Sequence, residues 1–286
     1  MELDVKDKAS SLFGATDVGP DIQEIDDNLY AVNVTPQEAM KEYALMVLKI
    51  KLIYRAVFEN RVVRSFLRVI PGLNELVMLG KAYYHATETD DNDEPRWDKV
   101  IVDAPATGHG IFFLKIPSVI TDIISSGRMF EEAKQILELL EDPERTGIAL
   151  VTLAEDMPVN ETLMLGETIR DEMDFPIACV IANAIYRPLF DDDEMQWVDT
   201  VRQREDLSDG SGGFEASGFL EASRFRADRV ELQQHYLEKL RDNCEWPLLE
   251  IPHYFFDRMS FAIIDEIADD LNAILDGDDS DSEPGK

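Results

Sequence analysis

The second half of the sequence alternates short apolar runs with helical segments, and no other feature constrains the fold as strongly. Three runs rich in β-branched residues, at 99–103, 147–154 and 177–183, are predicted to be strands. Helical segments predicted over about 118–140 and 159–173 separate them. This alternation is typical of a parallel sheet with helices on both faces. The sequence therefore predicts an α/β fold with a mostly parallel sheet.

The remaining segments are predicted to complete one domain over 1–275. Thr35 is expected to cap a helix, because Pro36 suits the first helical position and Glu38, three residues after the cap, completes a capping box. The other expected elements are a strand at 28–34, a helical insertion at about 36–85, a flexible acidic and Gly/Ser-rich segment at about 190–220, a helix at 221–243, a strand at 248–251, a helix at 257–275 and a disordered acidic tail at 276–286.

The charge of the chain narrows the classes of partner. The 286 residues include 59 acidic and 27 basic side chains, a formal net charge of −32. Such a field repels phosphate, so it disfavours nucleic acid and anionic membranes, and a bound nucleotide would need local positive charge. No apolar run approaches the ~20 residues of a membrane-spanning helix, which argues against direct membrane insertion.

Two cysteines, Cys179 and Cys244, form neither a disulfide framework nor a Cys-x-x-C motif, so a cytoplasmic location is expected. Residues 41–68 reverse the charge of the chain, with seven Lys and Arg against two Glu. They are interpreted either as solvated flanks of an apolar helix or as a docking face for an acidic partner, such as a second copy of this chain.

Candidate ligand-binding residues follow the predicted strands, because ligands of parallel α/β sheets bind outside the carboxyl ends of the strands. The rule selects Asp4, 103–109, 154–157 and Asn183. Asp103 could hold Mg²⁺ through a water molecule, as a Walker B carboxylate does, or it could only cap the turn after its strand. Thr107, Gly108 and His109 would then form a mobile loop able to sense a γ-phosphate. Asn183 could be a base-reading side chain or a turn residue.

Five segments, in order, resemble the ArsA family, the arsenite-pump ATPases and their relatives that target tail-anchored membrane proteins. Residues 98–117, DKVIVDAPATGHGIFFLKIP, resemble the second switch of that family without gaps. The other segments are ELDVKDKASSLFG at 2–14, IPGLNEL at 70–76, VTLAEDMPVNETLML at 151–165 and VIANAIYRPLF at 180–190. Beyond residue 190 only EIPHYFFDRM, at 250–259, resembles the family, and more weakly.

The resemblance implies a P-loop NTPase fold, ATP and Mg²⁺ as cofactors, and ATP hydrolysis between two subunits. It implies that Asp4 orients the attacking water and that Asp103 holds Mg²⁺ through water. The second switch would transmit the state of the γ-phosphate through Ala104, Pro105, Thr107, Gly108 and His109. Asn183 would contact adenine, and Pro252 would help to form the adenine pocket. In the targeting branch, helices of the region 36–85 form a client groove, so an apolar-helix protein client is a further hypothesis.

The sequence also departs from the family pattern. The Gly-rich phosphate loop with two lysines, and the strand before it, are absent, and the 15 glycines do not form such a loop elsewhere. Asp-Ala-Pro-Ala replaces Asp-Thr-Ala-Pro in the switch. The zinc-binding Cys-x-x-C of the targeting branch and the duplication of the pump branch are also absent. The chain is therefore expected to bind ATP weakly or not at all.

Two hypotheses account for the missing loop. In the first, Met1 is an internal methionine of a longer gene product that carries the strand, loop and helix. In the second, the chain is a non-catalytic pseudo-ATPase, or a subunit that pairs with a complete ArsA-like paralogue.

Overall fold

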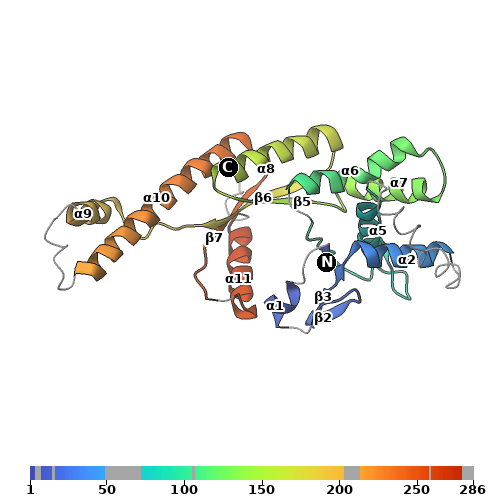
Figure 1. Ribbon diagram of the computed structural model, residues 1–286, viewed down its shortest axis with the longest axis horizontal. Coiled ribbons are helices and arrows are strands. Elements are labelled where there is room, and N and C mark those ends of the chain that lie inside the picture. Colours follow the sequence, from blue (N-terminus) through green and yellow to red (C-terminus); the bar gives the residue numbers. More distant parts are fainter. Residues whose placement is uncertain are drawn as a thin grey trace, which may run out of the picture. The chain divides into compact units, whose positions relative to one another are not determined.

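The computed structural model describes residues 1–3, 8–14, 17–48, 72–104, 107–202, 213–257 and 259–278 (Figure 1). Contacts group the chain into two compact units. The first unit comprises Met1–Thr146, Met173–Pro176 and Arg258–Asp265, and the second comprises Gly147–Glu172, Ile177–Asp257 and Glu266–Lys286. The single domain predicted over 1–275 stays a prediction, and each unit is described by itself.

The first unit combines short strands with four longer helices in its described residues. Its elements are β1 (Glu2–Leu3), α1 (Ala9–Phe13), β2 (Gln23–Asp26), β3 (Leu29–Ala31), β4 (Asn33–Val34), α2 (Pro36–Leu48), α5 (Leu73–Thr87), α6 (Thr107–Ile123) and α7 (Arg128–Glu141). Strands β2 and β3 form an antiparallel hairpin. The capping box of α2 is confirmed, because the Thr35 hydroxyl donates to Glu38 Oε2 at 2.9 Å and accepts from the Glu38 N–H at 3.4 Å.

Strand β1 lies between β4 and the segment that ends at Asp103. It pairs in parallel with β4. On its other side the Asp103 N–H donates to the Met1 carbonyl at 2.9 Å, and the Leu3 N–H donates to the Asp103 carbonyl at 3.4 Å. The predicted strand at 99–103 is reduced to one bridge between Glu2 and Asp103, and Ile101 is 78% exposed. The prediction of a buried strand there is wrong, because β1 has only two residues with which to form a ladder.

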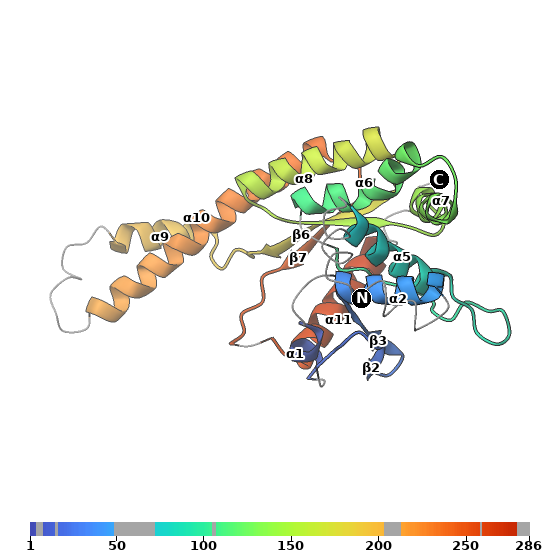
Figure 2. The same ribbon diagram turned by 45° about the vertical axis from the view of Figure 1, so that its right-hand side comes forward.

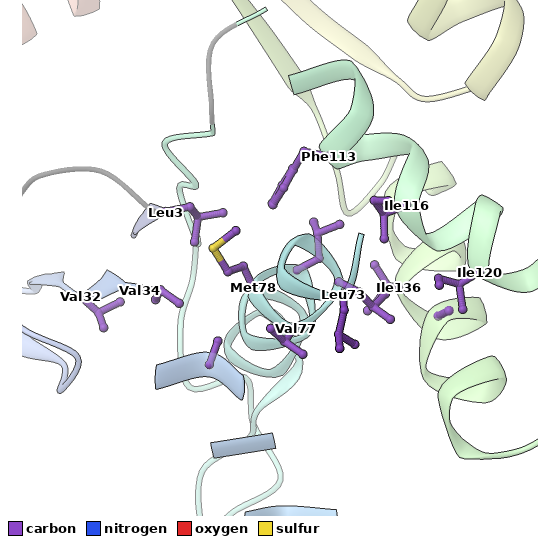
Figure 3. Packing of buried hydrophobic residues seen from close by; sticks show 14 residues of the cluster. Leu3, Val32, Val34, Leu73, Val77, Met78, Phe113, Ile116, Ile120 and Ile136 are labelled. Carbon is purple, nitrogen blue, oxygen red and sulfur yellow. The ribbon is translucent and has the colours of Figure 1, made fainter. Parts of the chain in front are cut away.

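Helices α5, α6 and α7 pack with β1 and β4 around the core of the first unit (Figure 3). Phe113, Ile116 and Ile120, spaced by one helical turn, point from α6 into this core and are 1%, 1% and 8% exposed. The helix predicted over 118–140 is in fact two helices, because Gly127, with φ of +102°, separates α6 from α7. Helix α6 also begins eleven residues earlier than predicted, since its buried apolar face extends upstream to Phe113.

The second unit is built on a three-stranded parallel sheet in the order β5-β6-β7, which confirms the predicted α/β class. Helices α8 and α10 lie along one face of this sheet (Figure 2), where Val159, Leu237 and Leu240 are fully buried. On the other face Val151 is 63% exposed. The elements after α7 are β5 (Ile148–Leu153), α8 (Asp156–Thr168), a π-helical turn (Ile169–Met173), β6 (Ile177–Ile185), α9 (Asp192–Arg202), α10 (Gly213–Asn243), β7 (Leu248–Pro252) and α11 (Phe261–Asp278).

The segment 190–220, predicted to be flexible, contains α9 and the start of α10. Helix α9 packs on α10, and Val198 of α9 is 2% exposed. The few apolar residues of α9 stand among acidic and polar neighbours and give too weak a periodic signal to predict such a helix, whereas burial against α10 stabilises it. Residues 203–212 and most of the predicted acidic tail, 279–286, lie outside the described residues.

No helix within the described residues is long and apolar enough to cross a membrane.

Candidate functional site

The parallel strands of the second unit end at one edge of their sheet. Leu153 of β5 is in register with Asn183 of β6, and Ile185 of β6 is in register with Pro252 of β7. The structure therefore brings the predicted residues Asn183 and Pro252 to the same edge, together with Glu155, which follows β5. This is the edge at which parallel α/β sheets bind their ligands.

The end of β6 turns sharply at Ala184, which has φ of +59° although it is not a glycine. Side chains on both sides hold this turn. The Asn183 Oδ1 accepts the Ala184 N–H at 2.9 Å. Gln233 of α10 donates from Nε2 to the Ala184 carbonyl at 3.0 Å and accepts the Tyr186 N–H on Oε1 at 2.7 Å. A left-handed alanine persists only where its surroundings determine it, and such positions cluster at functional sites.

Helix α10 presents Arg226, Arg229 and Gln233 on one face, because their spacing of three and four residues repeats with the helical turn. Arg229 donates to Glu155 Oε1 at 2.8 Å. Arg226 donates to the Arg187 carbonyl at 2.9 Å. Two guanidinium groups thus stand near the strand ends of a chain whose net charge is −32. The charge of Arg229 is compensated by Glu155, so Arg226, which has no carboxylate partner among the described residues, is the source of local positive charge here.

Four further side chains form a stacked cluster beside Pro252. The rings of Tyr186 and His253 lie 4.4 Å apart with an interplanar angle of 20°, and the rings of His253 and Phe255 lie 4.6 Å apart. The Arg226 guanidinium lies 5.0 Å from the Tyr186 ring centre and 5.1 Å from that of Phe255. His253 Nδ1 and Arg226 Nε are buried without a hydrogen-bond partner among the described residues. The cluster therefore stacks its ring faces on one another and keeps two polar atoms without a partner among the described residues.

Sequence reasoning predicted a helix at 221–243 but missed this cluster and the residues that α10 contributes near the strand ends. The run His253 to Phe256 directly after Pro252 is an aromatic signal that could have indicated a stacking site. Nothing in the sequence marks Arg226, Arg229 or Gln233, since only the packing of α10 along the sheet places them at the strand ends.

The side chain of Asn183 has unused hydrogen-bond donors and an unused acceptor, which recognition of a base requires. Its side chain is exposed, and Oδ1 makes its one hydrogen bond to the residues that the structure describes. The amide Nδ2 and one lone pair of Oδ1 remain available. An amide can donate to a ring nitrogen of adenine while it accepts from the exocyclic amine, as in bidentate asparagine–adenine pairs.

The residues of the predicted switch lie in the first unit. Asp103 is exposed, and its carboxylate makes no hydrogen bond or ion pair with any residue in the described ranges. Ala104, which follows it, is also exposed. Asp4 and Pro105 lie outside the described residues. Asp103 and Asn183 belong to different units.

The prediction of a mobile loop at 104–109 is wrong for residues 107–109, which are helical. Thr107, Gly108 and His109 form the first turn of α6. Gly108 and Gly110 do not prevent a helix at the start of α6, because the buried apolar face of α6 from Phe113 onward stabilises the helix through packing.

The described residues offer Mg²⁺ single carboxylates and not a cluster of ligands. No group of three His, Cys, Asp or Glu side chains in the described ranges is placed to hold a metal ion. An exposed single carboxylate such as Asp103 suits Mg²⁺, which keeps several waters and is commonly bound through one or two carboxylates and substrate phosphates.

The sequence model of the ArsA family, described as an anion-transporting ATPase, matches residues 6–128, which include Asp103 and the start of α6. Over these residues the chain is similar to the ArsA family. ATPase BagA of Mycobacterium tuberculosis is 31% identical over 156 residues, which cover 54% of this chain and 45% of BagA. The arsenical pump-driving ATPase of Acidiphilium multivorum is 26% identical over 158 residues, 50% of this chain and 26% of that protein. The chain thus spans less than half the length of these ArsA relatives.

Proposed function

We propose that this chain binds the adenine base of ATP at the carboxyl edge of β5, β6 and β7, as part of an ArsA-type ATPase. The observation that carries the proposal is the end of β6, where the exposed Asn183 amide projects beside a left-handed Ala184 that the buried Gln233 fixes. Pro252, in register with the end of β6, offers an apolar surface for one face of the base.

The other predicted residues take complementary roles in this proposal. Asp103 holds Mg²⁺ through water, and Asp4 orients the attacking water. Ala104, Pro105, Thr107, Gly108 and His109 link the state of the γ-phosphate to α6. Bound Mg²⁺ would neutralise charge on the phosphates, and Arg226 offsets part of the repulsion between the acidic chain and the nucleotide.

The sequence contains no glycine-lysine phosphate loop, so the residues present fit the base better than the triphosphate. The chain alone is therefore expected to bind adenosine and Mg-ATP with similar, weak affinity. An alternative function is a subunit that pairs with a second copy or a complete ArsA-like paralogue, acts on a protein client with an apolar helix, and leaves hydrolysis to its partner.

Base selectivity tests the proposal directly. Saturation-transfer NMR of the chain with adenosine, guanosine and Mg-ATP should show adenosine binding, weaker guanosine binding and no large gain from the triphosphate. Asn183→Ala should abolish the preference for adenosine, whereas Asn272→Ala, an exposed position on α11, should keep it. Equal binding of both nucleosides, or an unchanged preference in Asn183→Ala, would contradict the base site. Much tighter binding of Mg-ATP than of adenosine would contradict the conclusion about the phosphate loop.

A separate experiment, sedimentation, tests whether the chain pairs with an ArsA-type partner. Sedimentation of the chain alone and with an ArsA-type ATPase that contains the phosphate loop should reveal a complex that forms or dissociates with Mg-ATP. A chain that stays monomeric in every mixture would contradict the pairing.

A further inference from the structure

The first unit contains a cavity of about 660 Å³ bounded mainly by α2, α5 and α7. Its volume lies in the range of small-molecule sites, about 300–1,000 Å³. None of the residues assigned above to nucleotide binding lines it. The cavity therefore needs an explanation of its own.

Apolar side chains form most of the wall. Leu73, Leu76 and Val77 of α5 face Ile136 of α7, and all four are at most 7% exposed. Figure 3 shows Leu73, Val77 and Ile136 close to one another at the junction of α5 and α7. Removal of water from such a wall favours an apolar ligand.

Four of the five charged side chains that line the cavity form ion pairs. Lys81 Nζ lies 2.9 Å from Glu42 Oε1 and also donates to the Pro20 carbonyl at 3.3 Å. Arg128 Nε lies 2.6 Å from Glu132 Oε1. The fifth, Asp21, has no ion-pair partner among the described residues, so the lining carries a net negative charge that disfavours an anion. Any charged ligand would also lose hydration beside the apolar wall.

His85 supplies unmet hydrogen-bonding capacity in the wall. Both ring nitrogens are buried and lack a hydrogen-bond partner among the described residues, and the side chain is 11% exposed. Nδ1 lies 3.7 Å from Glu88 Oε1, too far for a hydrogen bond. Burial lowers the pKa of His85, so the neutral ring offers one donor and one acceptor at pH 7. A buried polar group of this kind is costly unless a ligand or water satisfies it.

We propose that this cavity binds an uncharged, mostly apolar small molecule that carries one hydroxyl or carbonyl group, with His85 as its hydrogen-bond partner. The net negative charge of the lining disfavours an anion, the apolar wall takes the body of the molecule, and His85 orients its polar group. None of the residues proposed to bind the nucleotide lines this site.

The probe for this site is 2-naphthol, a neutral fused-ring alcohol, with 2-naphthalenesulfonate as an anion of similar shape. Gly80 of α5 lines the cavity, and a Cβ at this position would meet no atom within 4 Å. Gly80→Leu therefore places a side chain in the free volume, and leucine favours a helix more than glycine does. The matched control is Gly218→Leu on α10, where a Cβ also meets nothing within 4 Å.

Fluorescence titration of the full chain should show saturable binding of 2-naphthol and no binding of the sulfonate at the same concentrations. Gly80→Leu should weaken binding at least about 10-fold by steric exclusion, and Gly218→Leu should leave it unchanged. His85→Phe should weaken binding by roughly 3- to 10-fold, the effect of one neutral hydrogen bond. Circular dichroism confirms that each variant is folded.

Three results would overturn the proposal. They are no saturable binding of 2-naphthol by the unmodified chain, equal binding of the naphthol and the sulfonate, and full binding by folded Gly80→Leu. Displacement of 2-naphthol by an apolar helical peptide, without binding of other small alcohols such as 4-butylphenol, would identify a protein client instead and would also refute it.

Discussion

Replacement of Gln233 by leucine tests the turn on which the proposed base site depends. Gln233 is 3% exposed, and its amide both donates to the Ala184 carbonyl and accepts the Tyr186 N–H. Leucine keeps much of the side-chain volume and removes both hydrogen bonds. Two backbone groups are then left unpaired where the strand ends.

The expected loss of stability follows from those two groups. Each unsatisfied buried backbone group costs about 1–3 kcal/mol, and the turn can relax toward water, so we expect a total near 2–4 kcal/mol for the second unit. With a urea dependence of about 1–3 kcal/mol/M, the unfolding midpoint should fall by roughly 1–2 M. Hydrogen exchange followed by mass spectrometry should show that the Tyr186 amide loses its protection.

Gln234→Leu is the matched control, since Gln234 is the exposed neighbour on the same helix. It should leave both the midpoint and the exchange at Tyr186 unchanged. If Gln233→Leu and Gln234→Leu are equally stable and Tyr186 stays protected, Gln233 does not hold the turn. The proposed base site at Asn183 would then not be preorganised by this turn.

Two further predictions concern ionisation and salt. Burial and a hydrogen bond to Glu132 raise the pKa of Tyr43 to about 12. The stability that Tyr43 contributes is therefore complete below the ordinary tyrosine pKa of about 10 and is lost as pH rises toward 12. Absorbance titration of Tyr43→Phe should lack one late-ionising tyrosine, and an unchanged late phase would contradict the assignment. Because the net charge is −32, raising KCl from about 0.1 M to 1 M, which shortens the Debye length from about 10 Å to 3 Å, should stabilise the chain against urea. A salt-independent midpoint would contradict strong self-repulsion.

Local chemistry made several features predictable from sequence. The capping box at Thr35 depends on residues three positions apart, and the parallel strands β5, β6 and β7 follow from apolar β-branched runs bounded by helical segments. The rule that ligands bind at strand ends selected Asn183, which the structure places beside Pro252.

Features that depend on distant residues were predicted poorly. The run at 99–103 has the composition of a buried strand, but only two residues of β1 pair with it, so Ile101 is exposed. Residues 107–109 have the glycine and polar content of a loop, but the buried face of α6 extends the helix through them. In both cases long-range contacts outweigh local preference.

The sequence by itself determined the α/β class, the position of Asn183 near the end of a strand, and the absence of a glycine-lysine loop from the residues present. Only the tertiary structure decided that Gln233, Arg226 and Arg229 stand near the ends of β5 and β6, and that an apolar cavity with His85 in its wall lies between α2, α5 and α7. The physical reason is that residue type and spacing specify local hydrogen bonds and periodic faces. Which faces meet depends on the packing of the whole unit, because hydrophobic burial has no direction of its own.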